Sequence, residues 1–442
     1  MQSTPQQSQG LWTRARKGFD TVFRRLEGFT AAPNSAYYLI LGSTIALTAI
    51  GILMVVSASS VESIAAGASP YADGGKQAVV AVLGFICMFL LSRSNVNFWH
   101  RIAWPAYFLA VVLLLALFVI GIRVNGNLNW INVGGFSLQP SEAAKLAMSV
   151  WLAHILARKE KLLDRWQHVF IPAILFSGVI VGIVMVQHDL GTALILMSLL
   201  FSALFFAGVN YKILSGFGLF LVLAAGVSAL TSGNRMCRIT TWITGEACSG
   251  DSGSAYQSTN GLYGLASGGL FGTGLGQSRQ KYSWIPEAHN DFIFAIVGEE
   301  LGLVGALVIL ILFAVLGINI FRVVVRQEQL FHRVLGGSIM VWILGQAALN
   351  MAMVTGLLPV IGVPLPLISY GGSALLMTLM AIGVVLSLAR DSTGAPAGRG
   401  AKGKQVKGKA SKTKPRSGLV RGPGKQKPSK SARQAPERVT SS

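Results

Sequence analysis

The chain is poor in charge and rich in apolar residues. Of its 442 residues only 12% are charged, whereas 52% are hydrophobic. Soluble globular domains carry about a quarter of their residues as charged side chains. The scarcity of charge therefore excludes an ordinary soluble protein and indicates a chain whose solvent is largely lipid.

Cysteine and histidine are also scarce, which excludes the common zinc sites. The three cysteines have the wrong spacing for such a site, and the six histidines form no ligand motif. Cys87 falls within a long apolar run, where it is expected to pack. Cys237 and Cys248 fall in one loop expected outside the membrane, where a disulfide is stable. The sequence leaves open whether these two pair.

A nucleotide-binding loop is excluded as well. The glycine-rich stretch "GLYGLASGGLFGTGLG" (261–276) invites that interpretation. A dinucleotide fold requires a strand before the glycines and a fixed spacing between them, and the sequence has neither. The glycines therefore need another explanation.

Long apolar runs dominate what remains. A membrane-spanning helix needs roughly 20 such residues, and the runs of about this length lie at 36–57, 77–92, 102–121, 141–157, 169–187, 190–208, 212–230, 292–321, 335–357 and 368–389. They predict an all-α polytopic membrane protein with about ten transmembrane helices. The residues 231–290 would form a large extracytoplasmic loop between helices 7 and 8.

Basic residues orient the chain, because Lys and Arg collect at the cytoplasmic ends of membrane helices. They cluster before the first run and in alternate connections after it: Arg14, Arg16, Lys17, Arg24 and Arg25, then Arg93 and Arg101, then Arg158, Lys159, Lys161 and Arg165, then Arg322, Arg326 and Arg333. The pattern predicts a multi-pass protein of the cytoplasmic membrane with both termini cytoplasmic.

Three regions follow from this pattern. Residues 1–35 form a cytoplasmic arm, 36–390 the transmembrane domain, and 391–442 a tail with 14 Lys or Arg against two acids. The arm and the tail have too little apolar surface to fold alone, so both are expected to be disordered. The tail would suit a clamp on anionic lipid, a docking segment for an acidic cytoplasmic protein, or a solvated anchor. It has no interleaved aromatic residues, so nucleic acid is not an expected partner.

Long connections on the outer face point to a cavity. They are 123–142, 231–290 and 356–376; the first two are rich in Gly and Asn, and the third combines Pro with apolar residues. Irregular backbone at membrane depth is tolerated where protein shields it or where it lines a cavity. The three loops are therefore expected to roof a cavity open to the outside.

Acids gather where the polar loop before residue 292 turns into an apolar run. Asp291 lies at the turning point, where it or Asn290 would make a good helix N-cap. Glu299 and Glu300 follow about 12–14 Å further along the helix, close to the middle of the bilayer. A centred charge costs at least about 2.5–3.5 kcal/mol, so both glutamates are expected to face the protein interior.

The helical face of Asp291 also carries small residues. Gly298 and Gly302 follow it at offsets of seven and eleven. Such a glycine pair lets another helix approach closely. The sequence therefore places Asp291 at the outer mouth of the bundle interior, above a close helix contact.

Basic side chains are available to meet these acids. Glu142 and Lys145 are three residues apart and share one helical face, while Arg235 and Arg279 lie in the long outer loop. Two interpretations stay open. The charges either form interior salt bridges or line a polar cavity that receives the charged headgroup of a lipid-linked substrate.

Five segments at these residues resemble one known family. They are "NGNLNWINVGG", "QPSEAAKL", "QHDLGTALIL", "GLASGGLFGTGLGQSRQKYSWIPEAHNDFIFAIVGEELGLVG" and "GLLPVIGVPLPLISYGGSALL". In this order they resemble the SEDS family (shape, elongation, division and sporulation) over nearly all of 36–390. The division branch is the more similar one, and the basic tail and outer cysteines resemble actinobacterial forms. The resemblance implies a ten-helix peptidoglycan glycosyltransferase that polymerises lipid II into glycan strands outside the membrane, beside a class B penicillin-binding transpeptidase.

The resemblance assigns roles to single residues. The essential acid of the family falls on Asp291, and its conserved Glu and Lys fall on Glu142 and Lys145. Because the transfer inverts the sugar carbon, Asp291 is expected to be its general base or to hold a divalent cation, Mg or Mn; no organic cofactor is expected. Lys145 is the first candidate to meet the leaving pyrophosphate, followed by Arg235 and Arg279.

Further substrate contacts are expected from His289, Trp130 and Ser369. The other expected partners are the growing glycan strand, the transpeptidase and other division proteins at the septum, with anionic lipid or an acidic division protein on the tail. Alternatives stay open: a flippase that transports lipid II, a non-catalytic division scaffold, or an elongation polymerase of the same family.

The chain departs from the family pattern at two positions. Asn129 stands where the family usually has Arg, which removes a candidate phosphate contact. Arg123 or a basic residue of the long outer loop would have to compensate. His188 stands where Pro is usual, and this change is expected to cost rigidity in the turn rather than chemistry.

Overall fold

The computed structural model describes residues 35–124, 127–133, 136–163, 165–230, 233–246, 253–282 and 288–392. By its contacts the chain divides into Met1–Ala395 and Pro396–Ser442, and the described residues all belong to the first unit. The predicted N-terminal arm, apart from Ser35, and the tail beyond Ser392 lie outside the described residues. Their boundaries and disorder stay predictions.

Helices make up most of the described residues and confirm the predicted all-α membrane class. Within these residues eight helical runs are long and apolar enough to cross a membrane: α2 (Ser35–Ala65), α3 (Ala72–Leu91), α4 (Val96–Ile120), α6 (Trp166–Val169) continuing through a π-helix (Phe170–Leu175) into α7 (Phe176–Val186), α8 (Leu190–Ala207), α12 (Ile293–Arg326), α13 (Leu330–Val354) and α14 (Gly372–Ser392). This set supports a polytopic membrane protein.

Two more helices occupy the remaining predicted spans. They are α5 (Pro140–Arg158) and α9 (Tyr211–Leu230). Nearly every residue of α5 is buried, so this helix touches protein on all sides and needs no lipid-compatible face. Its lower hydropathy follows from that central position. The count of ten crossings stays a prediction.

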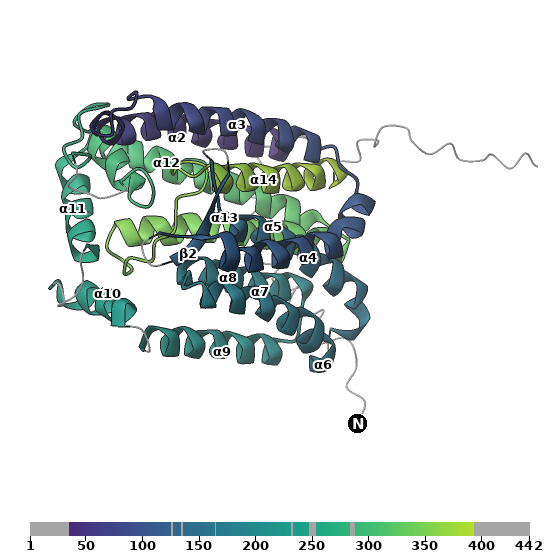
Figure 1. Ribbon diagram of the computed structural model, residues 1–442. Helices are drawn as coiled ribbons and strands as arrows, with labels where there is room; N and C mark the ends of the chain where they lie inside the picture. Colours follow the sequence, from purple (N-terminus) through teal and green to yellow (C-terminus); the bar gives the residue numbers. More distant parts are fainter. Residues whose placement is uncertain are drawn as a thin grey trace, which may run out of the picture. The chain divides into compact units, whose positions relative to one another are not determined.

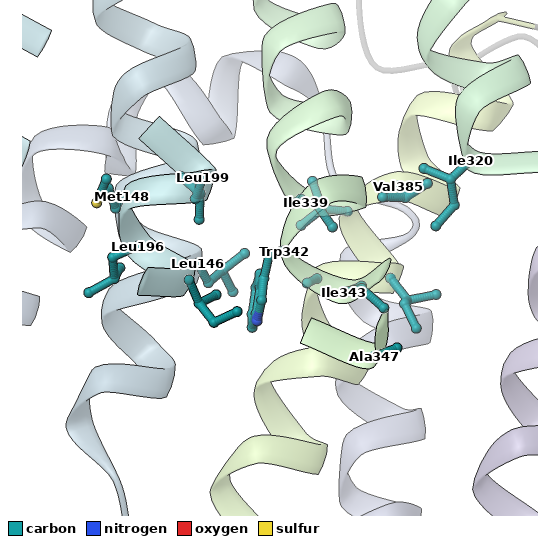
Figure 2. Packing of buried hydrophobic residues seen from close by; sticks show 14 of the residues in the cluster. Leu146, Met148, Leu196, Leu199, Ile320, Ile339, Trp342, Ile343, Ala347 and Val385 are labelled. Carbon is teal, nitrogen blue, oxygen red and sulfur yellow. The ribbon is translucent and has the colours of Figure 1, made fainter. Parts of the chain in front are cut away.

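Helices distant in sequence pack side by side. The helix α14 lies against α3, α12 against α2, and α13 against both α8 and α5. Figure 1 shows α2, α3, α12 and α14 together near the top of the view. Figure 2 shows the core between α5, α8 and α13, where Trp342 of α13 points toward Leu146 of α5. Lipid tails are as apolar as a core, so close packing of this kind drives the association of membrane helices.

The outer connections are more regular than the sequence led us to expect. The stretch 123–142, predicted as a loop, contains a three-stranded antiparallel sheet of order β1-β2-β3: β1 (Ile122–Val124), β2 (Asn127–Val133) and β3 (Phe136–Leu138). The sequence between β1 and β2 is Asn-Gly, the pair that tight hairpins favour. The predicted loop 231–290 contains two helices, α10 (Gly233–Thr244) and α11 (Ser254–Ser267).

The helix α12 starts later than expected and is broken near its outer end. It begins at Ile293 with Phe292 as a cap that makes no side-chain hydrogen bond, so neither Asn290 nor Asp291 is the N-cap. The backbone of Gly302 has φ +68° and ψ −167°, a conformation that essentially only glycine adopts. Exposed large apolar side chains on α12 begin at Leu303, and the depth of Glu299 in the bilayer stays a prediction.

The glycine-rich segment of the outer loop explains the break. The carbonyls of Glu299 and Glu300 accept hydrogen bonds from the backbone of 273–274, and the amides of 303–304 donate to the carbonyls of 269–270. A side chain on Gly302 would overlap this segment. The close approach predicted at Gly298 and Gly302 is therefore made by α11 and the loop after it, not by a second membrane-spanning helix.

Candidate active site

A single cavity of about 1000 Å³ brings most of the predicted site residues together. Its lining draws on all three loops expected to enclose it and on the outer parts of α5, α8 and α13. Six of the eight predicted site residues line it: Trp130, Glu142, Lys145, Arg235, His289 and Asp291. Lining of this mixed polar and apolar kind suits a ligand with a charged head and an apolar tail.

Asp291 lies in the cavity wall, just before α12. The Asn350 side-chain amide of α13 donates to the Asp291 carbonyl and to the Val363 carbonyl, both at 2.7 Å. A Cβ built on Gly362 would lie 3.5 Å from Asp291 Oδ2, so the carboxylate faces the 355–371 loop. One buried amide therefore fixes both the backbone of Asp291 and the loop opposite its side chain.

Glu142 and Lys145 lie deeper in the cavity and form a buried pair. The Lys145 ammonium lies 2.8 Å from both Glu142 carboxylate oxygens and 2.9 Å from Gln346 Oε1, and 5.0 Å from the centre of the Trp342 ring. Both charged side chains are at most 3% exposed. The pair belongs to the cavity lining and to the bundle interior at once, so the two interpretations of these residues are compatible.

Arginines form the basic part of the wall. Arg235 and Arg238 of α10 and Arg123 of β1 all line the cavity. Arg238 Nη1 donates to the Val360 carbonyl at 3.3 Å, and Trp242 Nε1 donates to the Gly356 carbonyl at 2.8 Å. The helix α10 is thus tied to the loop that faces Asp291.

Sequence reasoning did not assign Arg238 a role, although a signal existed. It follows Arg235 by three residues, and residues at this spacing share a helical face. Arg123 lines the same cavity. It is one of the residues expected to compensate for the phosphate contact that Asn129 cannot make. Three guanidinium groups therefore border the space in which Asp291 stands.

Asn129 meets a carboxylate instead of a phosphate. Its Nδ2 donates to Asp189 Oδ2 at 3.2 Å, as does Gln139 Nε2. Thr192 donates to the same carboxylate through its backbone amide and its hydroxyl, at 3.0 and 2.8 Å, where Asp189 caps α8. These neutral donors and the positive end of the helix dipole stabilise the buried charge. Asn129 thereby holds β2 against the start of α8.

The turn before Asp189 is shaped by His188. Its φ of +67° lies in the left-handed region, and proline, fixed near −65°, cannot adopt it. The departure from the family pattern at this position therefore changes the turn geometry and not only its rigidity. His188 also lines the cavity.

Two predicted site residues lie outside the cavity lining. Arg279 is exposed, and its backbone amide donates to Glu299 Oε1 at 2.8 Å. The Ser369 hydroxyl accepts from the Leu365 amide at 2.8 Å, which closes a turn in the 355–371 loop. Both contacts are structural, and neither residue is brought to Asp291.

Glu299 and Glu300 hold the outer loop in place, as the sequence predicted for interior charges. Both are 1% exposed. Glu299 accepts from the Ser278 hydroxyl and from the Arg279 amide. Glu300 accepts from the Ser57 hydroxyl of α2 at 2.6 Å and lies 3.7 Å from the Lys281 ammonium. The two carboxylates therefore tie residues 278–281 to the break in α12.

Beside the cavity mouth, Tyr370 is held as a neutral phenol. Burial, followed by the nearby Asp73 carboxylate, raises the pKa of Tyr370 to about 12. Its hydroxyl donates to Asp73 Oδ1 at 3.3 Å. At neutral pH this group can only donate or accept a hydrogen bond, so it is not a candidate base.

A metal ion would find few ligands of its own here. Within the described residues no group of three or more His, Cys, Asp or Glu side chains is arranged to hold one. Mg²⁺ is often bound by one or two carboxylates together with substrate phosphates, and Asp291 fits that arrangement. Cys237 is disulfide-bonded and Cys87 is free; Cys248, whose pairing with Cys237 the sequence left open, lies outside the described residues.

The sequence of this chain matches one protein family and several of its members. The family model of the FtsW, RodA and SpoVE cell cycle proteins matches residues 37–394. The probable peptidoglycan glycosyltransferase FtsW of Mycobacterium tuberculosis is 38% identical over 368 residues, which cover 83% of this chain and 70% of that protein. The stage V sporulation protein E of Bacillus subtilis is 37% identical over 82% of this chain and 99% of that protein.

Solved structures agree with these matches. A chain from a study of how a peptidoglycan synthase complex coordinates polymerization and crosslinking superposes with a TM-score of 0.65 and 25% identity, over 80% of this chain and 97% of that one. RodA of Thermus thermophilus superposes with a TM-score of 0.59 and 26% identity, over 80% and 96%. With its family match over residues 37–394, this chain belongs to the SEDS family of FtsW, RodA and SpoVE proteins and is FtsW-like.

Proposed function

We propose that this protein is a peptidoglycan glycosyltransferase that polymerises lipid II into glycan strands at the outer face of the cytoplasmic membrane. The observation that carries the proposal is the position of Asp291 in the wall of a cavity bordered by Arg123, Arg235 and Arg238. A carboxylate and several guanidinium groups in one cavity are what a transfer from a pyrophosphate donor requires. The FtsW-like family membership supports the same reaction.

The chemistry divides between the two kinds of group. The acceptor hydroxyl loses its proton to Asp291 while its oxygen bonds to the anomeric carbon of the donor. The bond from that carbon to the pyrophosphate oxygen breaks, and its electron pair leaves with polyprenyl pyrophosphate. A positioned carboxylate base contributes roughly 10²–10⁴-fold, and the arginines stabilise the charge that develops on the leaving oxygen.

Lys145 has a smaller share in this proposal than the sequence suggested. Its ammonium is already held by Glu142 and Gln346 and is buried. The arginines reach the cavity from its outer elements and form bidentate contacts with phosphate oxygens more readily than a lysine does. A divalent cation, if used, would be held by Asp291 together with substrate oxygens and would act as a Lewis acid on the pyrophosphate.

The proposal extends to place and partners. The alternation of basic connections supports cytoplasmic termini, which puts the cavity mouth and α10 on the outer side. A class B penicillin-binding transpeptidase is the proposed partner, since a family structure comes from a complex that couples polymerization to crosslinking. Septal cell division is the proposed setting, because the similar relatives include FtsW.

Reconstitution in vesicles tests the reaction. Purified protein receives labelled lipid II, with and without the transpeptidase, and two products are followed: glycan ladders on a gel and lipid II carried across the bilayer. Ladders from the wild type support the proposal. Transport without ladders, even with the partner present, would replace the polymerase with a flippase; neither product would favour a scaffold.

A further inference from the structure

A second polar group lies beside Asp291 in the same cavity. His289 stands two residues before it, and Glu62, near the end of α2, reaches the cavity from the other side of the mouth. His289 Nδ1 lies 3.3 Å from Glu62 Oε2. The His289 side chain is 11% exposed, whereas that of Glu62 is 64% exposed.

The His289 ring is also held from a second direction. The backbone carbonyl of His289 accepts a hydrogen bond from the Tyr370 amide at 3.0 Å. The two rings meet edge to face, with centroids 5.4 Å apart and an interplanar angle of 66°. Tyr370 is in turn bonded to Asp73 in the first turn of α3. The imidazole is therefore clamped between α2 and the loop before α14.

The pairing with Glu62 selects one form of the ring. A neutral histidine has one ring nitrogen that donates a hydrogen bond and one that accepts. The hydrogen-bond partner of one nitrogen decides which of the two carries the proton. When Nδ1–H donates to the Glu62 carboxylate, Nε2 carries the lone pair. Among the described residues nothing is bonded to Nε2, and His289 lines the cavity. The ring nitrogen left to accept a proton therefore belongs to a residue that lines the same cavity as Asp291.

We propose that Glu62 is a positioning residue that holds His289 with its Nε2 lone pair toward the acceptor hydroxyl of the polymerisation reaction. This rests on the proposed function. In the step itself His289 Nε2 takes the hydroxyl proton, the hydroxyl oxygen bonds to the anomeric carbon, and the electron pair of the broken carbon–oxygen bond leaves on pyrophosphate. The imidazolium then returns its proton to water. In this refinement His289 replaces Asp291 as the group that takes the proton, and the Asp291 carboxylate stabilises the imidazolium that forms.

This arrangement follows the logic of other activated bases, in which a third group orients the imidazole. Glu62 is largely exposed, so its contribution is expected to be smaller than that of a buried carboxylate. Replacing Glu62 by Ala should lower kcat for glycan polymerisation roughly 1.5- to 5-fold with KM for lipid II unchanged. Replacing His289 by Ala should cost roughly 10²-fold or more, the range for a lost general base.

The experiment compares Glu62→Ala, Glu62→Gln and Glu62→Asp in the reconstituted polymerisation assay, each checked for thermal unfolding in detergent. Glu246→Gln is the matched control, because Glu246 is an exposed acid of the outer loop outside the cavity lining. The expected result is a lower kcat for Ala and Gln, partial recovery with Asp, and no change in the control.

Three results would overturn the inference. One is a Glu62→Ala variant with wild-type kcat. Another is a variant in which only KM rises or the unfolding temperature falls, which would assign Glu62 to binding or to the fold. The third is a wild type that makes no glycan at all, with or without the transpeptidase; that result removes the proposed function itself and is recognised before any variant is compared.

Discussion

Replacing Lys145 by Met should destabilise the protein strongly, although the two side chains have similar length. The change leaves the Glu142 carboxylate at 3% exposure without the ammonium that lies 2.8 Å from both its oxygens. Removing one partner of a buried ion pair typically costs about 3–5 kcal/mol, because the remaining charge is buried and unpaired. We expect that loss in the free energy of unfolding.

A double variant separates the charge from the packing. In Glu142→Gln with Lys145→Met no charge is left buried, so most of the lost stability should return, and the coupling between the two changes should exceed about 1 kcal/mol. The pair Asp73 and Lys76 is a matched control, with the same spacing of three residues and an N–O distance of 3.0 Å. Lys76 is 51% exposed, so Lys76→Met should cost less than about 1 kcal/mol.

The measurement is unfolding by sodium dodecyl sulfate in mixed micelles, followed by helical circular dichroism. A Lys145→Met variant within about 1 kcal/mol of the wild type, comparable to the exposed control, would refute the reasoning. So would a double variant no more stable than the single one. If the double variant folds but makes no glycan, the Glu142–Lys145 pair serves the substrate as well as the fold.

Three further predictions address the outer face. Gly302→Ala should destabilise by roughly 1–3 kcal/mol, since its φ is +68° and its space is filled by the loop backbone. Gly178→Ala, in the helix α7 with open space around it, should not destabilise in the same unfolding assay, because Ala is the better helix former. Glu299→Gln and Glu300→Gln should loosen residues 278–281, so trypsin should cleave after Arg279 and Lys281 faster than in the wild type, and unchanged cleavage would contradict this anchoring. Because the pKa of Tyr370 is raised to about 12 from 10.0, its neutral form stabilises the fold below pH 10 and this contribution is lost as the pH rises toward 12; Tyr370→Phe should lose less stability over that range, and equal losses would count against the assignment.

Much of the site was predictable because its charged side chains lie in or beside apolar segments. Charge is costly within an apolar run, so Glu142, Lys145 and Asp291 stood out from sequence alone, and all three line the cavity. Glu299 and Glu300 stood out for the same reason. The break at Gly302 directly after them was not predicted, because the backbone contacts that cause it come from the distant residues 269–274.

What the sequence did not reveal depends on contacts between distant segments. Glu62 lies 227 positions before His289, and nothing local marks it as a partner. Arg279 and Ser369 belong to motif segments, yet the Arg279 amide donates to Glu299 of α12 and the Ser369 hydroxyl accepts from Leu365 of its own loop. The three-stranded sheet was missed because two of its strands have only three residues and β2 contains three Asn, a residue that strands usually avoid.

The most direct test of the account is polymerisation of lipid II by Asp291→Asn, measured beside the wild type after both are shown to unfold at the same temperature. The substitution keeps the shape of the side chain and removes its charge. The account predicts glycan ladders from the wild type and a loss of roughly 10²-fold or more in the variant. Ladders of equal length and rate from both proteins would contradict a catalytic role for Asp291.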